Sequence, residues 1–172
     1  MKISRFANAV AMASILASAL ALSACSKGDA PKGEAVAETP KVTLPAPKDN
    51  DPAAWKEYFR QELKPHINAR YRRPYSYFIP APIDEGTQQQ FDLQLENVQN
   101  AVGRGIQAGS MLAFAGPDSA KVGDVIVEAF KLAGAKSLKG VRVVVIATPD
   151  QKERVQAAIA PSEAEFIFVD MK

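Results

Sequence analysis

The stretch between residues 64 and 78 interleaves basic and aromatic side chains that could bind a partner. Guanidinium groups form paired hydrogen bonds with carboxylates or phosphates and stack on aromatic rings, whereas tyrosine buries a large area at little entropic cost. Both residue types are enriched at protein interfaces. The sequence therefore predicts a surface for a protein or an anionic ligand, made of Arg70, Tyr71, Arg72, Arg73, Tyr75 and Tyr77.

The same stretch has a second interpretation, as an internal clamp. Residues 56–73 contain six Lys or Arg residues against two acidic ones. Residues 84–96 contain four acidic residues and no basic one, at a spacing that matches no calcium-binding loop. In this alternative the aromatic rings fasten a proline-rich segment to the core, and the arginines pair with the acidic residues Asp84, Glu85, Asp92 and Glu96.

Groups that could support catalysis are sparse in this sequence. His66 is the only histidine, so any imidazole-based proton transfer depends on it alone. The chain contains no G-x-S-x-G motif and no glycine-rich phosphate loop. We expect no metal and no cofactor. A small hydrolase-type enzyme, using His66 or Asp118 in a cleft at the carboxyl ends of strands, is kept as an alternative.

Cys25 is the only cysteine of the chain and directly follows Leu22-Ser23-Ala24. Upstream, a positively charged start precedes an apolar run over residues 10–22, which is shorter than the roughly 20 residues of a transmembrane helix. This order is typical of a cleaved secretory signal peptide. A free thiol after an ordinary signal peptide is one interpretation, but it would leave an exported protein open to oxidation.

Residues 1–25 resemble the signal of bacterial lipoproteins, in which a small-residue motif precedes a lipidated cysteine. The resemblance implies a diacylglycerol thioether on Cys25, cleavage after residue 24, and an acyl chain such as palmitate on the new amine. Two or more chains hold a protein stably on a membrane. In the enterobacterial sorting pattern, Ser26 in place of aspartate implies the outer membrane rather than the inner one. We expect a lipid-anchored protein that faces the periplasm.

Cleavage would leave a mature chain with balanced charge. It removes two of the 21 basic residues and none of the 19 acidic ones, which leaves 19 of each. Nucleic-acid binding requires a clustered basic surplus and is therefore not expected. Residues 25–50 contain four prolines and no aromatic residue, which predicts a disordered linker. Residues 51–172 have the usual length of one domain.

The first half of this domain, residues 51–109, is predicted to be helical and proline-rich and to pack on the core. Asp51-Pro52 is typical of a helix start, and Pro65 is expected to kink or end that helix. The prolines between residues 74 and 82 exclude a central strand, so this stretch is expected to be an extended surface segment. Apolar spacing predicts a second helix over residues 87–107.

The second half, residues 110–172, alternates short apolar runs with helical patterns. Strands are predicted over residues 111–115, 141–147 and 165–170, and the second is the most apolar and therefore central. The β-α-β-α-β order implies parallel strands with right-handed connections. We expect an α/β fold with a small three-stranded parallel sheet, preceded by two helices on a disordered N-terminal tether.

Ligands of open parallel sheets usually bind beyond the carboxyl ends of the strands, which here are residues 116–119 and 148–151. Each turn contains a proline, which removes an N–H donor, and an aspartate, which occupies the positive end of the helix dipole. Thr148-Pro149-Asp150-Gln151 also has the form of a capping box. We interpret both turns as helix caps.

Together these features favour a non-enzymatic, lipid-anchored binding or accessory protein of the cell envelope. Its partner would be another envelope protein or an envelope polymer. An immunity lipoprotein that neutralises a toxin in the periplasm is an alternative interpretation, besides the small hydrolase.

Overall fold

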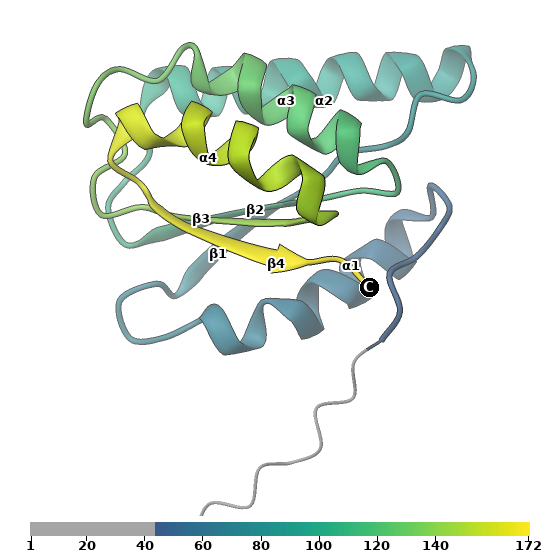
Figure 1. Ribbon diagram of the computed structural model, residues 1–172, viewed down its shortest axis with the longest axis horizontal. Coiled ribbons are helices and arrows are strands. Elements are labelled where there is room, and N and C mark those ends of the chain that lie inside the picture. The colour runs from purple at the N-terminus through teal and green to yellow at the C-terminus, as the bar shows by residue number, and fades with distance from the viewer. Residues whose placement is uncertain (1–43) are drawn as a thin grey trace, which may run out of the picture. The chain divides into compact units, whose positions relative to one another are not determined.

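Four parallel strands form the centre of the structure, a computed structural model that describes residues 44–172 (Figure 1). They are β1 (Arg73–Phe78), β2 (Ser110–Ala115), β3 (Arg142–Ala147) and β4 (Glu165–Asp170). Their order in the sheet is their order in the sequence, so β1 and β4 are the two edges. The predicted signal peptide, Cys25 and the predicted linker as far as residue 43 lie outside the described residues.

Helices cover both faces of the sheet. The connections between successive strands carry α2 (Glu85–Arg104), α3 (Ser119–Phe130) and α4 (Lys152–Ile159). These three helices lie on one face, as expected when every parallel connection has the same hand, and α1 (Pro52–Glu62) lies on the other (Figure 1). Short 3₁₀ turns are η1 (Lys64–His66), η2 (Pro149–Gln151) and η3 (Ala160–Ser162).

The two inner strands separate two apolar cores. Their side chains alternate, so that Phe114 and Val145 join the core under α2, α3 and α4, whereas Ala113 and Val144 join the core under α1. Trp55 of α1 is fully buried in the second core, with its ring 5.8 Å from that of Phe78. Burial on both faces explains why β2 and β3 are nearly continuous apolar runs.

The prediction of three strands is wrong, because the proline-rich stretch supplies a fourth. β1 pairs along its whole length with β2, with Pro74 opposite Met111 and Tyr77 opposite Phe114. An edge strand forms ladder hydrogen bonds on one side only, so a proline whose nitrogen faces the free side is tolerated. The prolines therefore correctly excluded a central strand but did not exclude a strand.

Two helix starts differ from their predictions. α2 begins at Glu85 because Asp84 and Thr87 form a capping box, in which Asp84 Oδ1 accepts from Thr87 N at 2.7 Å and Thr87 Oγ1 accepts from Asp84 N at 3.0 Å. The capping box predicted at Thr148 is wrong, since its side chain makes no capping hydrogen bond. The backbone there forms the η2 turn, and the Thr148 N–H donates to Ser119 Oγ at 3.0 Å.

Residues 44–50, at the end of the predicted linker, pack against the domain. Leu44 and Ala46 join the core under α1, and the Ala46 N–H donates to the Lys172 carbonyl at 3.1 Å. The Asn50 side chain pairs with the backbone of Ala81 through bonds of 2.8 and 2.9 Å. The described chain consequently begins beside its C-terminus (Figure 1).

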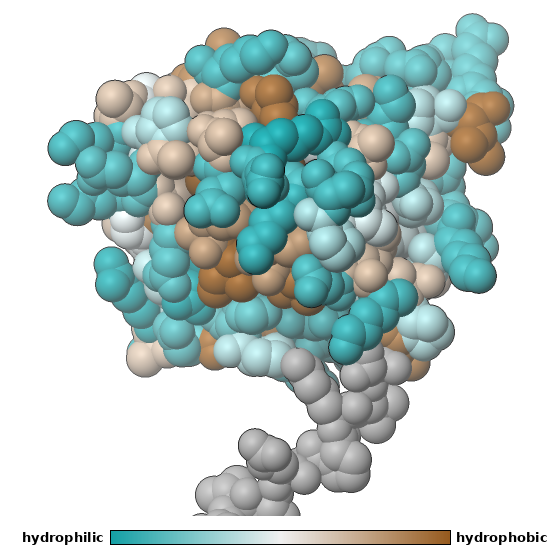
Figure 2. All heavy atoms as spheres, in the orientation of Figure 1, coloured by the Kyte–Doolittle hydropathy of each residue, from teal (hydrophilic) through white to brown (hydrophobic). Residues whose placement is uncertain are grey.

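The surface in view in Figure 2 is mostly hydrophilic on the side where α4 and β4 lie, with a small apolar area below α4. β4 is half-buried along most of its length, which accounts for apolar groups reaching this surface. Among the described helices, none combines the length and apolar character needed to cross a bilayer.

Candidate binding surface around the edge strand β1

Tyr71 lies in the interior and fastens the chain before β1 to the sheet. The residue is 2% exposed, and the guanidinium carbon of Arg142 lies 4.1 Å from its ring centroid, with that of Arg70 at 5.3 Å. The Tyr71 hydroxyl donates to Glu165, the first residue of β4. Tyr71 thus has the role that the internal-clamp interpretation gave to the aromatic residues.

Arg142 is the centre of this cluster. Its Nη2 and Nε atoms lie 2.6 and 3.1 Å from Glu165 Oε1, and its Nη1 donates to the His66 carbonyl at 2.5 Å. Hydrogen bonds from the Tyr71 hydroxyl and from Arg142 hold the pKa of Glu165 below its ordinary value. Burial and the bond to Glu165 raise the pKa of Tyr71. The cluster therefore joins η1 to the starts of β3 and β4.

The other residues of the predicted surface lie on or beside β1 and reach solvent. Arg72 and Arg73 are exposed, and Tyr75 is 49% exposed. Tyr77 is half-buried, with its ring stacked on Phe114 at 5.2 Å, and burial raises its pKa. Among the ion pairs of residues 44–172, none joins Arg70, Arg72 or Arg73 to the acidic group, which comprises Asp84, Glu85, Asp92 and Glu96.

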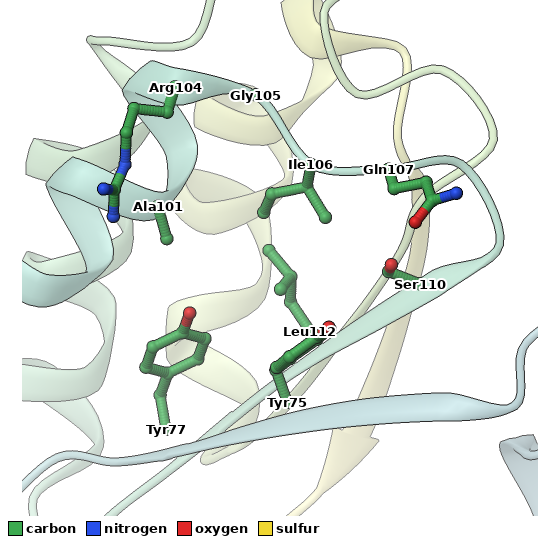
Figure 3. A pocket seen from close by; sticks show the side chains of 9 residues that line it. All are labelled: Tyr75, Tyr77, Ala101, Arg104, Gly105, Ile106, Gln107, Ser110 and Leu112. Carbon is green, nitrogen blue, oxygen red and sulfur yellow. The ribbon is translucent and has the colours of Figure 1, made fainter.

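One face of β1 borders a small cavity, which we call the α2 hollow. It has a volume of about 300 Å³ and lies between the Tyr75 and Tyr77 side chains and the end of α2 (Figure 3). Arg104 of α2 and Gln107 of the following loop also line it. Phenol, guanidinium and amide groups give this hollow hydrogen-bond donors suited to carboxylates and other polar groups.

The opposite face of β1 borders a larger cavity, which we call the α1 hollow. It has a volume of about 840 Å³ and lies between α1 with its η1 extension and the side chains of Pro74, Ser76 and Phe78. Phe59 and Ile67 give it an apolar floor, and Ile67 is 41% exposed. Its charged lining residues are Lys56, Glu57, Arg60 and Lys64.

The basic residues of α1 and η1 were missed by the sequence interpretation, although a signal was present. Lys56 and Arg60 of α1 and Lys64 of η1 follow one another at intervals of four residues, the spacing of one helix face. The prediction considered them only as part of a local charge surplus. Their spacing, rather than their number, is the signal that these three bases line the same hollow.

The turns at the carboxyl ends of β2 and β3 use their polar groups locally. Asp118 caps α3, with its Oδ1 accepting from Ala120 N at 2.9 Å and from Lys121 N at 3.2 Å. Hydrogen bonds from Thr148 and Gln151 lower the pKa of Asp150. The prediction that both turns are helix caps therefore holds for Asp118 and is wrong for the turn at Thr148, where Asp150 bonds neighbouring side chains instead.

His66 and Asp118, the two groups named for the hydrolase alternative, lie at opposite ends of the sheet. The His66 carbonyl bonds Arg142 where β3 starts, whereas Asp118 follows the end of β2. A six-residue strand spans about 20 Å, so the two side chains do not share a cleft. Within residues 44–172, no group of three His, Cys, Asp or Glu side chains is placed to hold a metal ion.

Comparison with known proteins gives no relative from which a role could be transferred. No family model matches the chain, and no curated protein or solved structure is significantly similar to it. A functional assignment therefore depends on the surface around β1 and on the N-terminal sequence.

Proposed function

We propose that this protein is a non-enzymatic binding or accessory protein of the bacterial cell envelope, lipid-anchored through Cys25 and facing the periplasm. The outer membrane is the favoured location because Ser26 follows the lipidated cysteine. The protein would act by holding another envelope protein. The hydrolase-type activity is a weaker alternative, since His66 and Asp118 lie at opposite ends of the sheet. The toxin-neutralising role is an alternative that would use the same surface.

The observation that carries this proposal is the placement of Arg72, Arg73 and Tyr75. All three are exposed on or beside an edge strand, while Tyr71 in the same stretch is buried. Exposed arginine and tyrosine side chains beside an apolar hollow are the anchors found at protein interfaces. A protein partner is favoured over a polar polymer because the α1 hollow has an apolar floor.

Crosslinking capture from envelope extracts tests the binding role. Replacing Arg72 and Arg73 together by Ala should weaken capture of the partner about ten-fold or more, since interface arginines often contribute on the order of 2 kcal/mol. The melting temperature should stay nearly unchanged, because neither residue forms an ion pair within residues 44–172 and the hydrogen bond from Arg72 Nε to the Ala69 carbonyl, at 2.9 Å, is exposed to solvent. The control replaces Lys131, just after α3, and Lys152, the first residue of α4, by Ala, because both are exposed and neither lines a hollow beside β1.

The control should capture the partner as well as the unchanged protein does. A double Arg variant that melts earlier, yet whose folded fraction captures normally, would show that these arginines serve the fold and not a partner.

The anchor is tested separately by Cys25→Ala. We expect this change to release the chain from washed membranes or to leave it unprocessed, because the proposed lipid chains supply the attachment. Membrane fractionation with salt and carbonate washes measures this. A processed Cys25→Ala product that resists both washes would contradict the lipid anchor.

A further inference from the structure

The outer edge of β1 has free backbone groups. The Ile79 N–H donates to the Ala115 carbonyl of β2 at 2.9 Å. Backbone groups of alternate strand residues point to opposite edges, so Tyr75 and Tyr77 also face β2, whereas Pro74, Ser76 and Phe78 face outward. Within residues 44–172, no other segment forms backbone hydrogen bonds with this outer edge.

Prolines limit the usable part of this edge. Pro74 occupies an outward-facing position, Pro80 is buried two residues past the end of β1, and neither has an N–H to donate. Between them, Ser76 and Phe78 keep outward N–H groups, and their carbonyls face the same way. Natural edge strands use proline to prevent uncontrolled pairing, so this edge accepts only a short additional strand.

The two hollows lie where the side chains of an additional strand would go. Side chains of a strand point alternately to the two faces of a sheet. A chain paired with β1 would therefore place every second side chain towards the α1 hollow and the others towards the α2 hollow. The backbone would provide affinity and the two hollows would provide specificity, as in known cases of strand addition.

The charge around the edge selects the occupant. Lysines and arginines contribute four of the residues that line the two hollows, and Glu57 is the single acid; because Glu57 pairs with Arg60, the lining has a surplus of three bases. Arg72 and Arg73 add two exposed bases at the start of the strand. An acidic segment complements this charge.

A second copy of the chain fits this edge less well. If it presented its own β1, like charges would meet. If it presented β4, that strand would offer only two acids, Asp170 at its end and Glu165, which is already held by Arg142 and Tyr71.

We infer that the partner of the proposed function binds as an extended acidic polypeptide segment that adds a strand to the outer edge of β1. Ser76 and Phe78 donate their N–H groups to it, and its side chains alternate between the α1 hollow and the α2 hollow. The inference rests on the proposed function and specifies the chemistry and conformation of the partner segment.

Amide hydrogen exchange on the processed full-length protein in detergent provides the first test. Without a ligand, the Ser76 and Phe78 amides should exchange faster than those of Tyr75 and Tyr77, which bond β2. Peptides selected from a displayed library of random short sequences then serve as probes. We expect the selected peptides to be rich in Asp and Glu and to slow exchange at Ser76 and Phe78 about ten-fold or more at saturation.

A pair of variants at one position separates the backbone from the side chain. Ser76→Pro removes the central outward N–H, whereas Ser76→Ala keeps it. Peptide affinity should fall at least about ten-fold in Ser76→Pro and change little in Ser76→Ala. If Ser76→Pro melts much earlier than the unchanged protein, its lost affinity could reflect unfolding. Amide exchange at Ser76 and Phe78 of the unchanged protein, measured with and without peptide, then decides whether the peptide pairs with this edge.

Each outcome of these experiments supports or overturns the inference. Selection of basic or neutral peptides, or binding that leaves Ser76 and Phe78 exchange unchanged, overturns it. Protection of these amides that increases with protein concentration, together with a measured molecular mass of a dimer, would identify a second copy as the occupant. That result also overturns the inference.

The inference and the proposed function fail in different ways. If a captured envelope protein depends on Arg72 and Arg73 but leaves the two amides unprotected, strand addition is wrong and the proposed function stands. If acidic peptides protect the amides but no envelope protein is captured, strand addition to β1 stands and the proposed function is wrong.

Discussion

At the residue scale, neighbouring side chains of one short stretch have opposite roles. Tyr71 is buried beneath Arg142 and bonds Glu165, whereas Arg72, Arg73 and Tyr75 face solvent. The interface and clamp interpretations were offered as alternatives for the whole stretch. The structure places Tyr71 in an internal clamp and leaves the exposed residues available for the proposed partner.

The clamp predicts a pH dependence of stability through Glu165. Because its pKa is lowered in the folded state, its contribution to stability is complete above the pKa of the unfolded chain and is lost as pH falls through the lowered folded value. Glu165→Gln should therefore reduce the free energy of unfolding at neutral pH by about 1 kcal/mol, a modest loss because this carboxylate is partly exposed. The loss should shrink in acid.

Thermal or urea unfolding across the acidic range measures this difference. Glu128→Gln is the control, since Glu128 forms only an exposed pair with Lys131 on the surface of α3. It should change stability by less than about 0.5 kcal/mol at any pH. A Glu165→Gln deficit that stays constant from neutral to strongly acidic pH would count against the clamp.

At the scale of elements, close backbone contact holds the end of β2 against the end of β1. A Cβ atom added at Gly116 would lie 2.0 Å from the Ile79 carbonyl oxygen, which is a backbone atom that cannot rotate away. The turn after β2 therefore requires glycine, because no Cβ atom fits between Gly116 and the Ile79 backbone. This contact also fixes the last part of β1, next to the outward-facing Phe78.

Gly116→Ala should consequently destabilise the protein by roughly 1–3 kcal/mol, the usual cost of forcing atoms into a filled region. Gly86→Ala is the matched control, since its added Cβ would lie 3.5 Å from Asp84 Oδ1 in the first turn of α2. There, alanine should be neutral or stabilising by up to about 1 kcal/mol. Chemical denaturation of both variants measures the free energy of unfolding. Equal stabilities would show that the backbone around Gly116 shifts to accommodate a Cβ atom at little cost.

At the scale of the whole described molecule, the chain before α1 completes the core. Leu44 and Ala46 pack beneath the sheet, Asn50 holds Ala81, and the Asp49 carbonyl accepts from Trp55 Nε1 at 2.8 Å. These contacts lie on the side of the predicted boundary at residue 51 that was assigned to the linker. The packed part of the chain therefore begins no later than residue 44.

A chain that starts at residue 44 should be more stable than one that starts at residue 51. The shorter chain loses the buried parts of Leu44 and Ala46 and the bonds of Asn50, which together should cost about 2 kcal/mol or more. Their melting temperatures give the comparison. As a control, Lys48→Ala in the longer chain should have little effect, because Lys48 is exposed. Equal melting temperatures for the two chains would show that residues 44–50 add no stability.

The sequence by itself determined the elements whose signals are local. Helical spacing indicated α2, the Asp51-Pro52 pair indicated the start of α1, and the continuous apolar run of β3 indicated a central strand. β4 was predicted at residues 165–170, its observed bounds. These predictions succeeded because periodicity depends on residues close together in the chain, whereas the capping box expected at Thr148 did not form.

Only the tertiary structure decided what depends on distant residues. β1 is a strand because β2 lies beside it, and its prolines are tolerated because nothing in the described chain pairs with its other side. Tyr71 is buried because Arg142 and Glu165, which are remote in sequence, converge on it. The hollows beside β1 form where α1 and α2 pass the same edge. Such contacts arise from the packing of whole elements, so no spacing within one segment encodes them.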